Sequence, residues 1–424
     1  MKKLLILSLI LFLSIACKDN EETPKATENF TVTIENVFST KPFFMSGATG
    51  LIMPGESESF SFYAGIGHKL SFATMFVQSN DLFYAPDAEG MSLYDNNRNA
   101  LSGDVTSMID LWDAGTEVNQ EPGVGPDQAP RQSGPDTGAD ENGTVNNIMD
   151  VSDGFTYPSD EEIIRVEITH DGGTKFTATI SNISNTSNLP TPFAPGVWLV
   201  YAGGNPLFTV GEVSSEGLED LAEDGNQSIL SDDITDNTGY VSPFAPGIWA
   251  VFDGDNPIHT IGQATTNGLE ALAEDGDPSA LAGNLSQQSG VRSSGTFTVP
   301  VGASSAAPIL PGEKYSFNLS AEEGYILNFA TMLVQTNDLY VAFTGQGVAL
   351  FNNGTPISGD ITSQISLFDV GTEVNEYPGA GNSQAPRQGS PDIGDDENGV
   401  VGLVNDAFTY PSVGDMIKVT ITAN

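Results

Sequence analysis

Short runs in which apolar and polar residues alternate recur along the whole chain. Four of them are Phe30-Thr-Val-Thr-Ile-Glu-Asn36, its near copy Phe176-Thr-Ala-Thr-Ile-Ser-Asn182, and the segments 164–169 and 417–422. Such alternation, with many β-branched residues, is typical of strands that bury one face. Further strands are expected at 59–63, 69–78, 105–112, 315–319, 326–335 and 361–368. Gly, Pro, Asn and Asp separate these runs, which indicates an antiparallel sandwich or barrel, and we favour the sandwich.

One long passage of the chain occurs twice, with the copies 256 or 257 residues apart. A spacing of this length is that of whole domains. The matching start and end strands predict two domains, at 29–172 and 173–424, joined at Asp171-Gly-Gly173. The copied blocks are Phe72 to Asp81 with Phe329 to Asp338, Asp113 to Asn119 with Asp369 to Asn375, Ala129 to Gln132 with Ala385 to Gln388, and Asp140 to Gly143 with Asp396 to Gly399. Several copied residues are polar and lie outside any apolar pattern, which indicates a site.

A shorter unit is also duplicated, at 190–240 and 241–291. Its signature is Pro-Phe-Ala-Pro-Gly followed by Val-Trp198 or Ile-Trp249, and later Gly-Leu-Glu-Asp/Ala-Leu-Ala-Glu-Asp-Gly. Leu218, Leu221 and Ala222 form one helical face, and Gly225 is a suitable stop. We therefore expect a few short helices in the second domain, and no such unit in the first.

The N-terminus has the pattern of an exported lipoprotein. Basic residues precede an apolar stretch, 4–15, that is too short to span a bilayer. Leu13-Ser-Ile-Ala-Cys17 resembles a bacterial lipobox, which predicts a signal peptide at 1–16 and lipidation of Cys17. Residues 17–28 form an acidic linker that resembles a surface-export tag, or is simply a charged spacer. The expected location is the bacterial outer membrane, lipid-anchored and exposed at the surface. Cys17 is the only cysteine, so no disulfide is expected.

The net charge of the chain excludes some classes of binding partner. The chain carries 56 acidic residues against 14 Lys and Arg, a formal net charge of −42. Such a surface repels phosphate backbones, so we expect no nucleic-acid partner. The hydrophobic fraction of 39% argues for a folded chain rather than a disordered one.

The copied blocks resemble a known family. Thr331-Met-Leu-Val-Gln-Thr-Asn-Asp338 followed by Asp369-Val-Gly-Thr-Glu373 is similar to the spondin N-terminal domain of F-spondin and mindin, in its bacterial form. The Gly-Leu-Glu-Asp-Leu-Ala-Glu-Asp-Gly225 block resembles the early part of such domains. The resemblance covers the second domain throughout and the later part of the first. It implies two C2-like β-sandwiches, each with a calcium site in its edge loops.

Transferred residue by residue, the resemblance implies one calcium per domain. The ligands would be Asp81, Asp113 and Glu117 in the first domain, and Asp338, Asp369 and Glu373 in the second. Animal members end the second motif in Asp, where this chain has Glu117 or Glu373. Calcium prefers hard oxygen ligands from several loops, which agrees with this set. The alternative is that these acids cap turns or face water. Asp140-Glu141 and Asp396-Glu397 form a second acidic pair, which we interpret as a solvated loop.

Catalysis has little support in the sequence. The three histidines are His68, His170 and His259, and two of them align with aromatic residues in the other copy. No nucleophile elbow or phosphate loop is present. The expected function is a calcium-dependent binding or adhesion module for matrix or glycan ligands, without catalytic residues. A carbohydrate hydrolase remains the alternative, because paired carboxylates cannot be identified from spacing alone. Trp198 and Trp249 could stack on a glycan, but their apolar neighbours favour the core.

Overall fold

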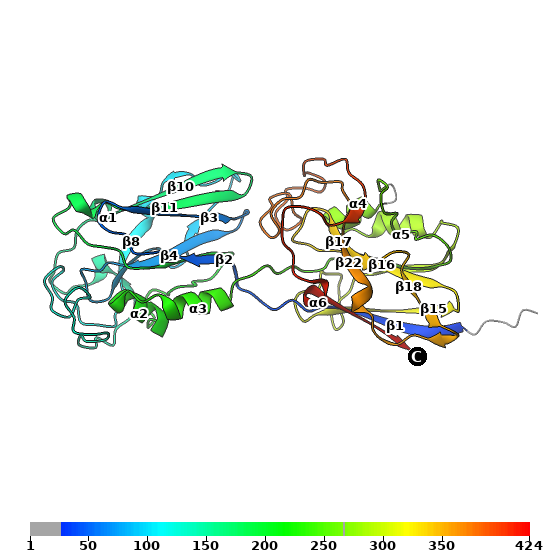
Figure 1. Cartoon of the computed structure of the whole chain (residues 1–424), viewed down its shortest axis with the longest axis horizontal. Coiled ribbons are helices and arrows are strands. Elements are labelled where there is room, and N and C mark those ends of the chain that lie inside the picture. The colour runs from blue at the N-terminus through cyan, green and yellow to red at the C-terminus, as the bar shows by residue number, and fades with distance from the viewer. Residues whose placement is uncertain (1–26, 266–267) are drawn as a thin grey trace, which may run out of the picture.

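The computed structural model describes residues 27–265 and 268–424. It is mostly β, with antiparallel sheets and a few short helices, which confirms the predicted fold class. The strands form two similar bodies that lie side by side (Figure 1). We call residues 43–239 the first body, and residues 27–36 with 240–424 the second body. The signal peptide, Cys17 and most of the acidic linker lie outside the described residues.

The first body is a sandwich of two sheets. The smaller sheet has the order β3 (Ser57–Tyr63), β11 (Lys175–Asn182), β10 (Ile164–Gly172) and β7 (Gly103–Asp104). The larger has the order β2 (Phe43–Ala48), β12 (Val197–Tyr201), β4 (Lys69–Met75), β5 (Leu82–Pro86), β8 (Ile109–Asp113) and β9 (Asn146–Asn147), with β6 (Met91–Ser92) beside β4. Their facing side chains form one core, and α1 (Asp160–Ile163) leads into β10.

The second body repeats this arrangement. Its smaller sheet has the order β15 (Lys314–Glu322), β1 (Thr27–Asn36), β24 (Ile417–Ala423) and β21 (Gly359–Asp360). Its larger sheet has the order β14 (Val291–Phe297), β13 (Gly247–Phe252), β16 (Ile326–Met332), β17 (Leu339–Phe343), β22 (Ile365–Asp369) and β23 (Gly402–Leu403), with β18 (Val348–Ala349) beside β16. The short ribbon β19 (Phe351–Asn352) and β20 (Thr355–Pro356) and helix α6 (Val413–Met416) complete it.

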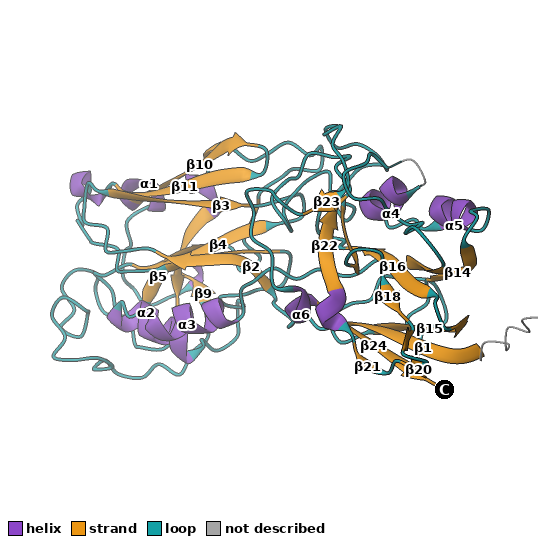
Figure 2. Ribbon diagram, turned by 45° about the vertical axis from the view of Figure 1, so that its right-hand side comes forward, coloured by secondary structure: helices purple, strands orange, loops and turns teal. Residues whose placement is uncertain are grey.

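A pair of helices forms a third layer on each larger sheet (Figure 2). These are α2 (Glu216–Asp224) and α3 (Ser228–Asp236) in the first body, and α4 (Leu269–Asp275) and α5 (Ser279–Leu285) in the second. Helix α2 ends at Gly225, whose φ of 66° is left-handed, as the sequence predicted. Each body thus holds one copy of the duplicated unit. Among the described residues, no helix is long and apolar enough to cross a membrane.

The division of the chain differs from the predicted domains at 29–172 and 173–424. Strand β1 pairs with β15 and β24 of the second body, while β11 pairs with β3 and β10 of the first. The reason is the segment predicted as a domain joint. Gly172 ends β10 and pairs with Lys175, so Gly173 and Thr174 form a two-residue turn of the β10–β11 hairpin; Gly172 and Gly173 have φ values of 102° and 58°. A turn this short keeps β11 beside β10, so the place between β15 and β24 is filled by β1.

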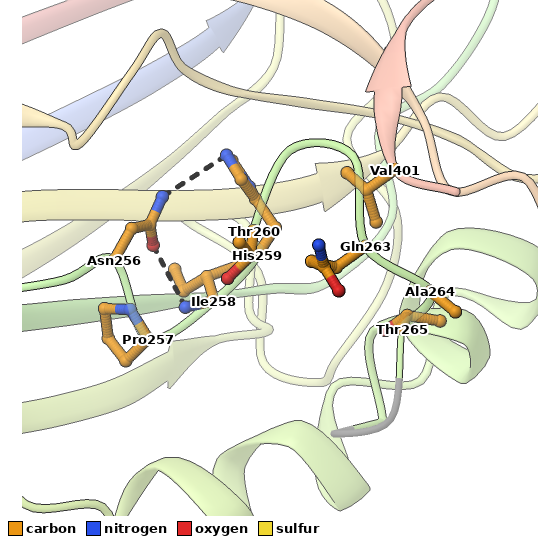
Figure 3. Close-up of a pocket in the computed structure, with 9 residues that line it drawn as sticks. All are labelled: Asn256, Pro257, Ile258, His259, Thr260, Gln263, Ala264, Thr265 and Val401. Atoms are coloured by element: carbon orange, nitrogen blue, oxygen red, sulfur yellow. Dashed lines mark hydrogen bonds between the residues drawn. The ribbon is translucent and has the colours of Figure 1, made fainter.

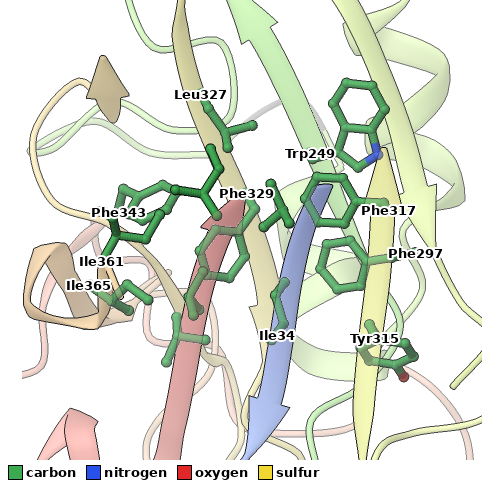
Figure 4. Close-up of a cluster of buried hydrophobic side chains, with 14 of the residues drawn as sticks. Ile34, Trp249, Phe297, Tyr315, Phe317, Leu327, Phe329, Phe343, Ile361 and Ile365 are labelled. Atoms are coloured by element: carbon green, nitrogen blue, oxygen red, sulfur yellow. The ribbon is translucent and has the colours of Figure 1, made fainter. Parts of the chain in front are cut away.

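Strand β1 contributes fully buried side chains to the core of the second body (Figure 4). Phe30, Val32 and Ile34 are fully buried, and Ile34 lies among aromatic side chains of both sheets. Trp249 stacks on Phe317 of the opposite sheet, with ring centroids 5.4 Å apart. Trp198 stacks in the same way on Phe60 in the first body. The two tryptophans therefore join the sheets, and their contacts support a packing role.

Direct contacts join the two bodies. The rings of Tyr63 and Tyr377 stack with centroids 3.9 Å apart, and the backbone N–H of Ile66 donates to Oδ1 of Asn382 at 2.8 Å. Arg98 also donates to the carbonyl of Asn382, at 3.3 Å. Tyr63 is the last residue of β3 and the other contact residues lie in loops, so none of these contacts involves β1.

Candidate metal centre

The copied aspartate before β17 is buried with only half of its carboxylate hydrogen-bonded. Oδ2 of Asp338 accepts from the backbone N–H of Thr372 at 2.8 Å, from the Thr372 hydroxyl at 3.2 Å and from the N–H of Glu373 at 3.2 Å. Its Oδ1 is buried and has no partner among the described residues. Asp81 repeats this arrangement, with an equally unpartnered Oδ1. A buried carboxylate oxygen without a hydrogen-bond partner is energetically unfavourable. A bound cation would remove this cost, because the free oxygen could act as its ligand.

The second copied aspartate lies at the same edge of the sheet. Leu339 pairs with Asp369 across β17 and β22, so the side chains of Asp338 and Asp369 meet where the strands turn. Oδ1 of Asp369 accepts from the N–H of Gly371 at 2.7 Å, and Oδ2 accepts from the amide of Asn375 at 2.8 Å. Position 371 requires glycine, because its φ of 75° is left-handed and a Cβ there would lie 2.7 Å from the backbone nitrogen of Val400. The repeated Asp-x-Gly-Thr is thus a turn that directs its backbone N–H groups at carboxylates.

A third acid, Glu397, joins these two. One carboxylate oxygen each from Asp338, Asp369 and Glu397 lies within 4.8 Å of the others. Calcium binds oxygen at about 2.3–2.6 Å, so two oxygens on one ion are at most about 5 Å apart. The three oxygens therefore fit around a single calcium ion. Glu141 holds the corresponding sequence position in the first body.

The charges of this cluster are poorly compensated. Burial, together with the smaller effect of the neighbouring Asp369, raises the pKa of Asp338 to about 7. Burial and Asp113 likewise raise the pKa of Asp81 well above its ordinary value. For Glu141, burial and then Asp113 raise the pKa, as burial and Asp369 do for Glu397. A bound cation would relieve both the desolvation and the repulsion.

The carboxylates of Glu117 and Glu373 make hydrogen bonds to groups other than the aspartates with which they were predicted to act. Oε1 of Glu373 accepts from the N–H of Gly394 at 2.8 Å, and Oε2 accepts from the amide of Asn337 at 3.2 Å. In the first body, Glu117 instead approaches Asp136 and Glu223 of α2. The contact of each glutamate with Asp81 or Asp338 is made by its backbone N–H.

Two acids near the site were missed by the sequence analysis. Asp153 adds to the repulsion at Asp113 and Glu141, and Asp406 does so at Asp369 and Glu397. Each accepts a hydrogen bond from a tyrosine four residues later. A cavity of about 510 Å³ opens beside the first-body site, and its lining includes Asn119, Glu141 and Asp153. The available signal was the repeat Asp-x-Phe-Thr-Tyr-Pro-Ser, whose copies start at 153 and 406.

The copied Ala-Pro-Arg-Gln blocks have a structural role. Nε of Arg387 donates to the carbonyl of Gly381 at 2.7 Å, and its Nη2 donates to Gln335 at 2.7 Å. Arg131 makes the equivalent bonds in the first body. The glutamine that follows the arginine donates to an aspartate of α2 or α4. These bonds hold the long loop against its body, so retention of the polar residues there reflects folding.

A separate cavity of about 330 Å³ lies beside His259 (Figure 3). The imidazole is buried against Phe368, with ring centroids 4.9 Å apart, and Nε2 lies 3.2 Å from the amide nitrogen of Asn256. Burial lowers the pKa of His259 to about 4. No acidic side chain is among the described residues that line this cavity, so it lacks the paired carboxylates of a glycoside hydrolase.

Helix α4 carries a buried glutamate, Glu274, whose raised pKa predicts a change of protein stability with pH. Burial raises the pKa of Glu274 on α4 to about 8, from an ordinary value of 4.5. Because the folded state holds this proton more tightly than the unfolded state, the contribution to stability falls as pH rises from about 4.5 to about 8. Glu274→Gln should therefore match the wild type at pH 4 and be more stable at pH 9, measured by chemical denaturation with chelator present.

The control for this variant is Glu216→Gln, which removes an exposed charge from the equivalent helix α2 of the first body, away from Glu274. It should shift stability little at either pH. If Glu274→Gln gained nothing between pH 4 and pH 9, the carboxyl group would not be desolvated in the way that the structure shows.

The chain matches no protein-family model and no curated protein. Any functional assignment therefore starts from the geometry of the site.

Proposed function

We propose that each body binds one calcium ion at the sheet edge. The ligands are Asp338, Asp369 and Glu397 in the second body, and the first-body site uses Asp81, Asp113 and Glu141. The observation that carries the proposal is the buried, unpartnered Oδ1 of Asp338 beside two further carboxylates. Three carboxylates and no nitrogen or sulfur ligand favour a hard cation, and irregular loops suit calcium better than the strict octahedron of magnesium.

The wider function follows from this site and from the N-terminal sequence. We infer a lipid-anchored protein of the bacterial outer membrane, held by Cys17, that acts as a calcium-dependent adhesion module for matrix or glycan ligands. Support comes from the resemblance of the copied blocks to spondin domains, and from a net charge of −42 that suits an exterior rich in divalent cations. A carboxylate-lined cavity next to the first-body site offers a place where a bound ion and a ligand can meet.

Binding to immobilised glycans and matrix proteins tests the adhesion proposal. The wild type should bind at least one member of the panel with millimolar calcium and release it when chelator is added. Asp113→Asn with Asp369→Asn should abolish that binding, because both sites lose a central carboxylate. The matched control is Glu216→Gln with Glu322→Gln, which removes one charge from each body outside the groups of clustered carboxylates and should bind like the wild type. Binding that is unaffected by chelator would contradict a calcium-dependent adhesion module.

A further inference from the structure

Strand β1 completes the second body although the chain continues from it into the first body. It lies between β15 and β24 and is antiparallel to both. Thr27 is paired with Glu322 at one end of the β15 ladder, and Asn36 is paired with Ile417 at the other end of the strand, on the β24 side. Residues 37–42 then lead directly to β2 of the first body. In Figure 1 the blue strand is therefore found in the body whose other strands run from green to red.

Strand β1 fits its position in the second body through a specific pattern of side chains. Phe30, Val32 and Ile34 point into the core, and Asn36 closes the strand. The amide of Asn36 donates to the carbonyls of Ser242 at 2.9 Å and Ile309 at 3.0 Å, and its Oδ1 accepts from the N–H of Phe38. These bonds satisfy buried backbone groups that would otherwise be unpaired. The strand is therefore bound by both its core side chains and its terminal asparagine.

The equivalent place in the first body is filled by β11 with the same pattern. Phe176, Ala178 and Ile180 are buried, and the amide of Asn182 donates to the carbonyls of Thr191 and Ile52 at 2.7 and 2.9 Å. The difference is connectivity. The hairpin turn at Gly172 ties β11 to β10, whereas β1 is continuous only with the neighbouring body.

We propose that β1 exchanges between two copies of this chain. In the exchanged dimer, β1 of each copy fills the place between β15 and β24 of the other. Every strand contact is kept. Val37 and Phe38 stay with β1, since the N–H of Val37 donates to the carbonyl of Met416 and Phe38 is buried in the core of the second body, so residues 39–42 and the contacts between bodies are what must rearrange. The first body needs no part of β1, since its two sheets are complete without it. The occupant is thus a second copy of the chain, and the recognition chemistry is that of strand addition. The inference does not depend on calcium.

Cysteine cross-linking tests this exchange. Thr31 and Asn318 face each other in the β1–β15 register, and their side chains are hydrogen-bonded at 2.8 Å. Thr31→Cys and Asn318→Cys are made in separate chains that also carry Cys17→Ser, so that each introduced cysteine is the only thiol. The two chains are unfolded together, refolded at high concentration and oxidised. A covalent heterodimer is expected.

The matched control uses Ser59→Cys and Thr179→Cys, which face each other in the β3–β11 register of the first body at a similar side-chain distance. Because the hairpin holds β11 in its own chain, this mixture should give no heterodimer above background. Light scattering of refolded wild type should show a dimer that is absent from a chain lacking residues 27–36. A refolded wild type that is wholly monomeric, or a heterodimer yield no higher than the control, would overturn the proposal.

Discussion

Removal of residues 27–36 is expected to unfold the second body while the first body keeps its structure. The deletion takes away the fully buried side chains of Phe30, Val32 and Ile34, and it exposes the edges of β15 and β24. Burial of each such side chain contributes about 1.5–3 kcal/mol, so roughly 5–9 kcal/mol is lost. Since a whole domain is stable by only about 5–15 kcal/mol, the second body is not expected to survive.

Hydrogen exchange read by mass spectrometry resolves the two bodies in one experiment. Amides of β16, β17 and β22 should lose protection in the deleted chain, whereas those of β4, β5 and β8 should keep it. A synthetic peptide of residues 27–38 should restore protection to the second body when added in excess, which separates loss of the strand from general misfolding. As a control, residues 37–239 alone should fold. Full protection of β16 and β17 without the strand would show that β1 is dispensable.

The same connectivity explains why the sequence could predict the strands but not the bodies. The sequence located β3, β4 and β8 and their copies as short apolar runs between turn residues. Only β3 and its copy β15 show the period of two that one-sided burial leaves, because β4 and β8 are buried on both faces. The segments that begin at Phe30 and Phe176 carry nearly the same letters, however, so composition cannot decide which body each one completes. That choice depends on the length of the Gly173-Thr174 turn and on the place of the duplicated unit. Both are properties of the whole topology.

The candidate site was predictable to a similar degree. Asp338 and Asp369 could be found from the copied blocks, and the structure brings them together at one sheet edge. Glu373 was included because of its spacing from Asp369, but spacing says nothing about which way a side chain leaves a turn. Glu397 comes from a loop 28 residues beyond Asp369, and its approach to the site is visible only in three dimensions.

Neutralising the buried aspartate should remove calcium binding without unfolding the protein. In Asp338→Asn with Asp81→Asn, the new amide can accept the bonds now made to Oδ2 and donate from the position of the unpartnered Oδ1. The variant should therefore be at least as stable as the wild type in chelator, because two desolvated charges disappear. Calcium should raise the melting temperature of the wild type only. Extracellular sites are weak, and calcium at about tenfold over its dissociation constant adds only about 1.4 kcal/mol per site.

Glu373→Gln with Glu117→Gln is the control that separates the present ligand set from the one predicted by sequence. These glutamates accept hydrogen bonds from a glycine N–H and an asparagine amide, and the side-chain oxygen of glutamine can keep one of these bonds. Calcium binding should persist in this variant. Its loss here, with retention in Asp338→Asn and Asp81→Asn, would move the ion to the glutamates.

Isothermal titration of calcium into the chelator-washed full mature chain tests the central claim most directly. The wild type should bind two calcium ions per chain, with dissociation constants of about 10⁻⁴–10⁻³ M. Asp338→Asn alone should bind one, and Asp338→Asn with Asp81→Asn should bind none. A wild type that takes up no calcium at millimolar concentration, or a double variant that still binds two ions, would contradict the account.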